Sequence, residues 1–565
     1  MCGIAGQFGP VSRKRVVAQL INAIGHRGPD QAAHFLEGHS YVGASCRLAI
    51  TERHNGIQPC TSVDGNVTVS LNGEIYNYLG LRKVLLERGA QLRDNTECEL
   101  LIAAYQLSGP SAFDLLEGMF AIALYDASVP RLFLVRDPMG IKPLYFTNHG
   151  SSIAYSSEQK SFFAAGLVSS EIDEVYGVHR SVFGFGPVGR TLFSEIRSVE
   201  PGTYLEVTTE STRVHHMALT AAASGTPLHD LEEVRDLVIG AIRIQVPAEV
   251  PWGVLLSGGV DSSIIATCAV KRVGAAGRLF TIKDEVETAD LVAARTVADS
   301  LQQPLVECVV PKASSQLLYE YLVAREEYDL LSLYTFVFCR SISGSVKAAL
   351  CGQGADELFA GYTFHRDVDA AIATFALRWE GLCSRASRMA AEVIDETLER
   401  LQSGERRRAF YQFFLREQLI WFQLDPLDKC SMAHGLEVRI PYLDHRLVRF
   451  ISALPVDAIF EGEKHLLREA FRGLGIPTLD RPKQFAGRWT IPRLHHDILN
   501  VCRRLGGSAV SNSYRYAWMV EDIAEAVCLE ALLILMGQCA GGIPAATDIA
   551  DMENLIRSRL SSSRS

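Results

Sequence analysis

The sequence of 565 residues lacks the features that direct a chain into a membrane or out of the cell. No apolar run reaches the roughly 18 residues that a bilayer-spanning helix needs, and no charged-then-apolar leader opens the chain. The 13 Cys show no paired spacing, which argues against a disulfide scaffold and favours a reducing compartment. We therefore expect a cytoplasmic protein with no membrane partner.

Clustered basic residues are lacking as well. The formal net charge is -10, and Lys and Arg do not gather into the stripe that binding to a phosphate backbone requires, so nucleic acid is not an expected partner. No internal repeat is present. Apolar residues make up 48% and charged residues 21%, as in globular enzymes. The length predicts two or three domains, and we expect two.

The first half of the chain, residues 1–210, contains short β-type runs separated by turn residues, which predicts antiparallel sheets. Examples are the runs 67–71, 120–125 and 131–135, and helical patterns interrupt them near 13–24 and 79–88. Residues 211–229 are rich in Thr, Ser and Ala without a sustained period, which predicts a linker.

The second half, residues 230–555, begins with a helix that Asp230 caps, with Glu233 at the capping-box spacing. Apolar strands then alternate with helical stretches, which predicts a parallel sheet flanked by helices, followed by a helical C-terminal part. The expected strands are 253–256, 279–282 and 348–351, and the expected helices begin near 261 and span about 289–301. Residues 556–565 are expected to form a flexible tail.

Cys2 follows the initiator Met, and its small side chain favours removal of that Met. The thiol and the α-amino group would then belong to the same residue, which would hold both the nucleophile and its base. An α-amino group titrates near ~8, so it can accept the thiol proton at neutral pH. The alternative is a Cys placed there by chance, which position alone favours.

Five segments in order carry a more specific signal. They are Met-Cys-Gly-Ile-Ala-Gly at 1–6, His-Arg-Gly-Pro-Asp at 26–30, Leu-Asn-Gly-Glu-Ile-Tyr-Asn at 71–77, Arg-Asp-Pro-Met-Gly-Ile-Lys-Pro-Leu-Tyr at 136–145 and Ser-Ser-Glu at 156–158. Together they resemble the glutaminase domain of class II amidotransferases. This resemblance implies an α+β N-terminal-nucleophile hydrolase sandwich, with antiparallel sheets and flanking helices.

The same resemblance implies roles at a glutamine site. Cys2 would attack the side-chain amide of glutamine to form a thioester, and the Asn72 side chain with the Gly73 backbone N–H would form the oxyanion hole. The glutamine-binding residues would be Arg47, Glu74 and Glu97. Glu97 stands where the family usually has Asp, so the charge is kept on a longer arm. By itself, Asn-Gly between apolar runs would predict a hairpin turn.

A second site is indicated at Val254–Ser263, where an apolar strand, a Gly-rich turn and a helix start follow one another. This order points backbone N–H groups and a helix N-terminus at an anion, and glycine lets phosphate approach the backbone. The string Ser-Gly-Gly-Val-Asp-Ser-Ser resembles the PP-loop of ATP pyrophosphatases, which implies that ATP is cleaved between its α and β phosphates. The implied ATP-binding residues are Leu256, Ser257, Gly258, Gly259, Asp261, Ser262, Ser263, Ile282, Gly352 and Gln353. The implied Mg²⁺ ligands are Asp261 and Asp356.

Two later strings, 428–444 and 463–468, extend the resemblance to glutamine-hydrolysing asparagine synthetases over nearly the whole chain. Lys464 matches the lysine that stabilises charge on the phosphate and adenylate; alone, a Lys one turn from Arg468 would be a solvated helix face. The implied substrates are glutamine, ATP and a carboxylic acid, with ammonia passing between the sites through an internal apolar passage. A homodimer is left open.

Two departures from the family pattern shape the expected reaction. Gln353 stands where the family usually has a Glu that handles the proton during ammonia attack, and an amide cannot take up that proton. Residues 326–338 are apolar where the family tends to offer Thr and Arg to aspartate, whose burial there would cost several kcal/mol. We therefore expect a less polar acid, as in relatives that make amide-bearing natural products.

Two alternatives are a true asparagine synthetase that uses aspartate, and a glutaminase or nucleotide-binding scaffold with an impaired synthetase site. A PP-loop enzyme that modifies tRNA would need a basic surface and paired Cys, and neither is apparent in the sequence.

Overall fold

The computed structural model describes residues 2–37, 40–51, 56–218, 230–274, 277–484, 490–507, 514–538 and 549–561. Residues 219–229 of the expected linker and 562–565 of the expected tail lie outside the described residues, as does Met1.

The first half contains two six-stranded antiparallel sheets that pack face to face. In spatial order the first sheet is β10 (Arg197–Ser198), β8 (Tyr145–His149), β9 (Ser152–Ser156), β1 (Cys2–Phe8), β3 (Tyr41–Arg47) and β2 (Gln31–Glu37). The second is β12 (Thr212–His216), β11 (Thr203–Val207), β7 (Arg131–Arg136), β6 (Gly118–Asp126), β5 (Val67–Ile75) and β4 (Cys60–Thr61). The expected antiparallel sandwich is confirmed.

Successive side chains along each strand point alternately into the core between the sheets and outward to the helices, which explains the layered arrangement. Ile4 points into the core between the sheets, whereas its neighbour Ala5 faces outward to a helix. In β6, Ala121 lies in the inter-sheet core and Ile122 in the outer one. The outer face of the first sheet is covered by α1 (Lys14–Ala23) and α4 (Lys160–Ala164), and that of the second by α2 (Tyr78–Glu87) and α3 (Glu97–Ser108).

The division between the two domains differs from the expectation in two places. Residues 212–216 form β12, which pairs with β11, so the sheet continues into the segment where a linker was expected. Helix α5 (Glu174–Phe183) belongs to the first half of the sequence but packs against α12 (Val368–Leu382) and α13 (Arg388–Gln402) of the second half. Composition predicted the linker, but strand pairing with β11 satisfies the backbone of residues 212–216.

The second half is built on a parallel five-stranded sheet, as expected. Its spatial order is β15 (Leu305–Val309), β14 (Arg278–Lys283), β13 (Trp252–Leu255), β16 (Ala348–Leu350) and β17 (Glu437–Arg439). The chain runs outward from β13 through β14 to β15 and then crosses back to β16 on the other side. Such a switch point leaves a crevice beyond the carboxyl ends of the two strands, where α/β proteins bind ligands.

Helices surround this sheet and form the C-terminal part. Asp230 caps the first of them by accepting the backbone N–H groups of Glu232 and Glu233. Apart from α12 and α13 they are α6 (Leu231–Gln245), α7 (Val260–Cys268), α8 (Ala289–Ser300), α9 (Ser315–Arg325), α10 (Leu333–Ile342), α11 (Ala355–Leu358), α14 (Arg406–Phe413), α15 (Asp425–Met432), α16 (His445–Ala453), α17 (Val456–Ile459), α18 (His465–Phe471), α19 (Pro492–Gly506), α20 (Ile523–Gln538) and α21 (Ile549–Ser561).

The expected flexible tail is wrong for residues 556–561, which belong to α21. This helix packs against α19 and α20, and its Ile556 is fully buried. The tail was predicted from its position at the chain end. Its apolar residues, however, are spaced so that they bury one face of a helix. Of the helices that the structure describes, none is long and apolar enough to cross a membrane.

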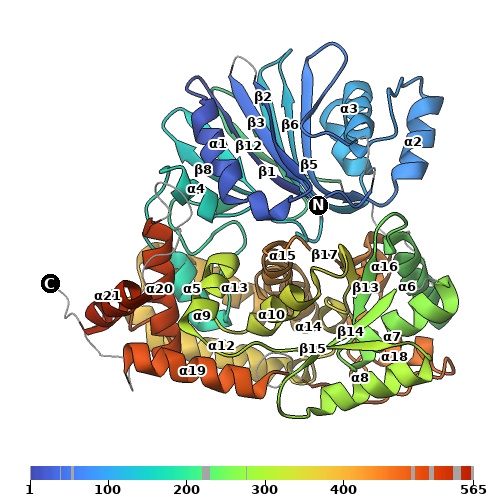
Figure 1. Cartoon of the computed structure of the whole chain (residues 1–565), viewed down its shortest axis with the longest axis vertical. Coiled ribbons are helices and arrows are strands. Elements are labelled where there is room, and N and C mark those ends of the chain that lie inside the picture. Colours follow the sequence, from blue (N-terminus) through green and yellow to red (C-terminus); the bar gives the residue numbers. More distant parts are fainter. Residues whose placement is uncertain are drawn as a thin grey trace.

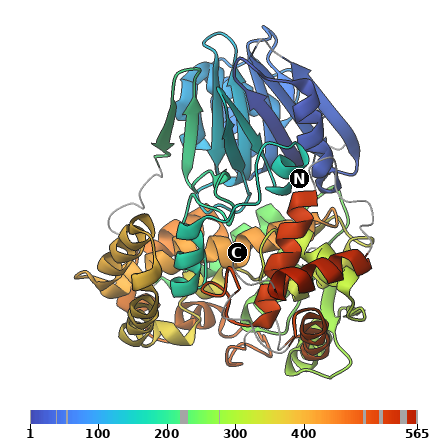
Figure 2. The same cartoon turned by 90° about the vertical axis from the view of Figure 1, so that its left-hand side faces the viewer.

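Apart from α5, which lies in the lower layer, the two halves form an upper and a lower layer in Figure 1, with α15 and β17 directly beneath the sandwich. The N-terminus lies at the boundary between the layers, and Figure 2 shows the same division from the side. Cys2 lies close enough to β17 of the second half for the Glu437 carboxylate to act on the pKa of its thiol, in the direction that raises it.

Candidate active sites

Cys2 begins β1 at the inner end of the sandwich and is 4% exposed. It lies directly opposite Arg47 in the ladder between β1 and β3. Its backbone N–H donates to Asn72 Oδ1 at 3.2 Å, which ties the start of β1 to the second sheet. Burial raises the pKa of the Cys2 thiol, and the Arg47 guanidinium acts in the opposite direction.

Asn72 and Gly73 lie inside β5, so the hairpin alternative is wrong. Gly73 has φ +152°, and a Cβ there would lie 2.0 Å from the carbonyl oxygen of Met119 on β6. Only glycine fits at that approach. Asn72 is fully buried, and its Nδ2 has no hydrogen-bond partner within the described part of the chain, which leaves a donor for a ligand.

The three expected glutamine-binding residues lie near Cys2 and Asn72: Arg47 ends β3, Glu74 is in β5, and Glu97 begins α3. Arg47 donates to the carbonyl of Thr51 at 2.9 Å, and the Thr51 hydroxyl donates to Glu74 at 3.3 Å. Glu97 begins α3 and accepts the backbone N–H of Ile75 at 2.5 Å. The side chains of Arg47 and Glu74 thus meet through Thr51, and Glu97 reaches the backbone next to Glu74.

Sequence reasoning missed a contact to this site from the other half. Arg439 of β17 pairs with Glu74 at 3.2 Å and with Glu437 on its own strand. Burial raises the pKa of Glu74, whereas the Arg439 guanidinium opposes that rise. No local pattern around Arg439 predicts this contact, because it depends on how the halves dock.

The second site follows β13. The Ser257 backbone N–H donates to Ser262 Oγ at 3.1 Å, and the Gly259 N–H donates to Ser257 Oγ at 3.3 Å, so the turn is closed by its own hydroxyls. Gly258 has φ +76°, and a Cβ there would lie 2.5 Å from the backbone nitrogen of Ala294 in α8. Glycine is therefore required for the turn to pack on that helix.

Two carboxylates and two ammonium groups meet beside this turn. Lys464 Nζ lies 2.5 Å from Asp261 Oδ2 and 2.7 Å from Asp356 Oδ1, and Lys483 pairs with the other oxygen of Asp356. Burial opposes ionisation of Asp356, but Lys464 and Lys483 outweigh it and lower its pKa to about 2. Burial raises the pKa of Asp261, with Lys464 opposing. Lys483 had not been expected at the site.

The glycine at 361 makes this cluster possible. A Cβ at Gly361 would lie 2.1 Å from Asp356 Oδ1 and 2.4 Å from Lys464 Cε. Lys464 itself has φ +52° at the start of α18, so it is not a residue of a solvated helix face. It is 2% exposed, and the alternative interpretation of Lys464 is wrong.

A pocket of about 150 Å³ opens over this cluster at the carboxyl ends of β13 and β16. Of the residues expected to bind ATP or metal, those on its wall are Leu256, Ser257, Gly259, Asp261, Ser262, Ile282, Gly352, Gln353 and Asp356, and the expected catalytic residue Lys464 lines it as well. Gly258 and Ser263 are not on its wall. The Ser263 hydroxyl donates to the Gly259 carbonyl at 2.7 Å and is bonded to the Thr478 hydroxyl at 2.8 Å, so it supports the turn from behind.

The apolar character expected for residues 326–338 needs a correction. Its three acids are buried and engaged away from the pocket: Glu326 with Lys429, Glu327 with Tyr176, and Asp329 with Arg325. Only α10 of this segment reaches the pocket, through Tyr334, Thr335 and Phe338. The acids were indistinguishable from pocket residues in the sequence because their partners are distant along the chain.

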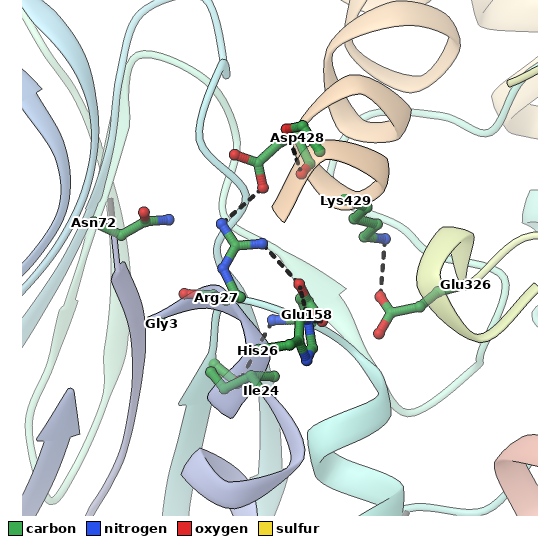
Figure 3. Close-up of polar contacts among 12 residues, drawn as sticks. Gly3, Ile24, His26, Arg27, Asn72, Glu158, Glu326, Asp428 and Lys429 are labelled. Atoms are coloured by element: carbon green, nitrogen blue, oxygen red, sulfur yellow. Dashed lines mark hydrogen bonds and ion pairs between the residues drawn. The ribbon is translucent and has the colours of Figure 1, made fainter. Parts of the chain in front are cut away.

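A buried chain of charges joins the two halves (Figure 3). Arg27 is fully buried and donates to Glu158 at 2.7 Å and to Asp428 of α15 at 2.8 Å. Lys429, the next residue of α15, pairs with Glu326 at 2.9 Å. The sequence motifs contained these residues without indicating that they meet.

Comparisons with known proteins match this division of the chain. A family profile described as glutamine amidotransferase domain matches residues 1–217, and one described as asparagine synthase matches residues 233–512. Asparagine synthetase [glutamine-hydrolyzing] 1 of Saccharomyces cerevisiae is 30% identical over 578 residues, covering 93% of this chain and 88% of the relative.

Two bacterial relatives are similar over comparable lengths. Asparagine synthetase [glutamine-hydrolyzing] 3 of Bacillus subtilis is 29% identical over 553 residues, covering 88% of each chain. Asparagine synthetase B [glutamine-hydrolyzing] of Escherichia coli is 28% identical over 503 residues, covering 83% of this chain and 79% of the relative.

Proposed function

Since the chain belongs to the glutamine-hydrolysing asparagine synthetase family and is an asparagine-synthetase-like amide ligase, we propose that it amidates a carboxylic acid less polar than aspartate. In this proposal Cys2 frees ammonia from glutamine, and the pocket beside β13 activates the acid with ATP. Ammonia then attacks the acyl-adenylate to give the amide, AMP and pyrophosphate.

The observation that carries the acceptor proposal is the composition of the pocket wall. Apolar side chains, including Phe338 and Leu427, share this wall with Gln353 and other polar side chains. Every cation on the described part of the wall is already paired: Lys464 with Asp261 and Asp356, Lys483 with Asp356, and Arg481 with Asp290 at 2.7 Å. Aspartate would bring an ammonium and a second carboxylate into this surface, and burying unpaired charges is costly.

In the glutaminase half, the Cys2 thiolate would attack the glutamine amide, with the α-amino group of the same residue taking the thiol proton. Asn72 Nδ2 is the unpartnered buried donor beside Cys2, which supports its role in holding the oxyanion. The Arg47 fork suits the glutamine α-carboxylate, and the carboxylates of Glu74 and Glu97 suit its ammonium.

In the synthetase half, Ser257, Ser262 and the first residues of α7 line the pocket where phosphate would bind. Lys464 would stabilise negative charge on the adenylate and the departing pyrophosphate. The Gln353 amide donates to the Tyr334 hydroxyl at 3.3 Å and cannot accept the proton of attacking ammonia. That proton would pass to another base, to an adenylate phosphate oxygen or to water.

The residues fit a Mg²⁺ ion. Asp261 Oδ1 is buried without a hydrogen-bond partner among the described residues, and Asp356 lies across the same Lys464. No group of three His, Cys, Asp or Glu side chains that could hold a metal occurs in the described ranges. Two carboxylates completed by phosphate oxygens and water is the usual arrangement for Mg²⁺, which would neutralise phosphate charge when bound.

The decisive experiment measures pyrophosphate release by the full-length protein with ATP, Mg²⁺ and glutamine across a panel of carboxylic acids that includes aspartate. We expect turnover with acids bearing an aromatic or aliphatic group and little with aspartate. Turnover with aspartate alone would refute the acceptor proposal. A Cys2→Ala variant is the matched control, since it should lose glutamine use but keep turnover with ammonium salts.

The second candidate is asparagine synthesis, which the names of the relatives favour. The third, a glutaminase or nucleotide-binding scaffold, is motivated by Gln353 but opposed by the intact arrangement of Lys464, Asp261 and Asp356. Acid-dependent exchange between pyrophosphate and ATP separates it from the other two. A cytoplasmic location and a homodimer also stay predictions, and light scattering tests the latter.

A further inference from the structure

Helix α15 contacts both candidate sites through consecutive residues. Leu427 lines the pocket beside β13, and Asp428 faces the sandwich, where it accepts from Arg27 at 2.8 Å and from Lys142 at 3.2 Å. Asp428 is 4% exposed. A carboxylate that the second half contributes is thus buried among cations of the first half.

Arg27 connects Asp428 to Cys2, the proposed nucleophile. Its Nε–H donates to the backbone carbonyl of Cys2 at 3.2 Å. Its two terminal nitrogens reach Glu158 and Asp428 (Figure 3). The guanidinium is planar, so three acceptors in three directions fix both its position and its orientation. The carbonyl it holds belongs to Cys2 itself.

Each of the other anchors of Arg27 comes from the first half. Glu158 is fully buried and also bonds His26 at 3.0 Å and Lys160. Without the negative charge of Asp428, one edge of the Arg27 fork would lose its charged acceptor, and a single amide oxygen would be left for both Arg27 and Lys142, so Arg27 could turn toward Glu158. The Cys2 carbonyl would then lose the donor that sets the first peptide of β1.

We propose that Asp428 is a positioning residue for glutamine hydrolysis, which acts from the synthetase half by holding Arg27 against the Cys2 backbone. This inference rests on the proposed role of Cys2 as the nucleophile. A small misplacement of a nucleophile can lower the rate by about 10²-fold. Glutamine itself would be held by Arg47, Glu74 and Glu97, so its KM should change little.

The test compares Asp428→Asn with Glu525→Gln in the full-length protein. Glu525 of α20 forms another ion pair between the halves, with Arg180 of α5 at 3.0 Å, and that pair does not contact Cys2. Both substitutions replace a carboxylate by its amide. We measure kcat and KM for glutamate release from glutamine, and the rise in unfolding temperature that Mg-ATP causes, which reports on the synthetase half.

We expect D428N to lower kcat roughly 10- to 100-fold with KM within about threefold of the unchanged protein. E525Q should keep kcat within about twofold, and D428E, which restores the charge, should recover part of the loss. A kcat for D428N within about twofold of the unchanged protein would overturn the proposal. An equal loss in E525Q would overturn it too, since it would indicate a general effect of weakening the contact between the halves.

If D428N does not fold, Arg27→Lys takes its place, because one ammonium on a flexible stem cannot hold three acceptors in a fixed plane. The same fall in kcat is expected, and its absence overturns the proposal. A Cys2→Ala variant separates the proposed role of Cys2 as the nucleophile from the proposed positioning role of Asp428. If C2A still hydrolyses glutamine, the proposed function fails; if only C2A is inactive and D428N is not, this inference alone fails.

Discussion

Asn72 offers the sharpest test of the glutaminase site, because its two side-chain atoms have separable tasks. Oδ1 accepts the Cys2 N–H at 3.2 Å, and Nδ2 is the buried donor without a partner among the described residues. Asn72→Ala removes both. Asn72→Asp keeps an oxygen acceptor, loses the donor and adds negative charge where the oxyanion would develop.

Loss of one oxyanion donor raises the barrier by about 2.7–4 kcal/mol. At about 1.36 kcal/mol per tenfold, this corresponds to a fall in kcat of about 10²–10³. N72A should therefore hydrolyse glutamine about 10²–10³ times more slowly than the unchanged protein. N72D should be at least as slow, because a carboxylate repels the oxyanion.

The assay is steady-state release of glutamate from glutamine, with Mg-ATP stabilisation of the same preparations as the control for intact folding. If N72D kept a kcat within about tenfold of the unchanged protein, Nδ2 would not be an oxyanion donor and the reasoning would be refuted.

Three further outcomes are expected. Lys464→Met should lower acid-dependent pyrophosphate release by about 10²-fold or more, with glutamate release unchanged, because it removes the cation between Asp261 and Asp356; equal loss of both activities would contradict this. Gly73→Ala should lower the unfolding temperature by several degrees, since its Cβ would lie 2.0 Å from a carbonyl oxygen, and an unchanged temperature would contradict the close approach. Burial and the neighbouring Asp356 raise the pKa of Glu357 to about 7, so its protonated form stabilises the fold below about pH 4.5, and this contribution is lost as pH rises through about 7. Glu357→Gln should therefore gain stability relative to the unchanged protein between pH 5 and about 8, and parallel unfolding curves would refute the shift.

Local patterns were enough to predict most elements of the fold. The runs 67–71, 120–125 and 131–135 all lie within strands, and the helical patterns at 13–24 and 79–88 correspond to α1 and α2. Alternating strands and helices predicted the parallel sheet, and the turn after β13 lies where its glycines indicated. These features depend on neighbours within a few residues, which is what hydrophobic periodicity and turn chemistry report.

The sequence motifs also predicted which residues gather at each site, since Cys2, Arg47 and Asn72 meet, as do Asp261, Asp356 and Lys464. What only the tertiary structure decided is the contact between the halves. Asp428 lies 401 residues from Arg27, and Arg439 pairs with Glu74 across the same boundary. Buried charges are tolerated only with a partner, and that partner depends on how the two domains dock, which no local pattern of residues contains.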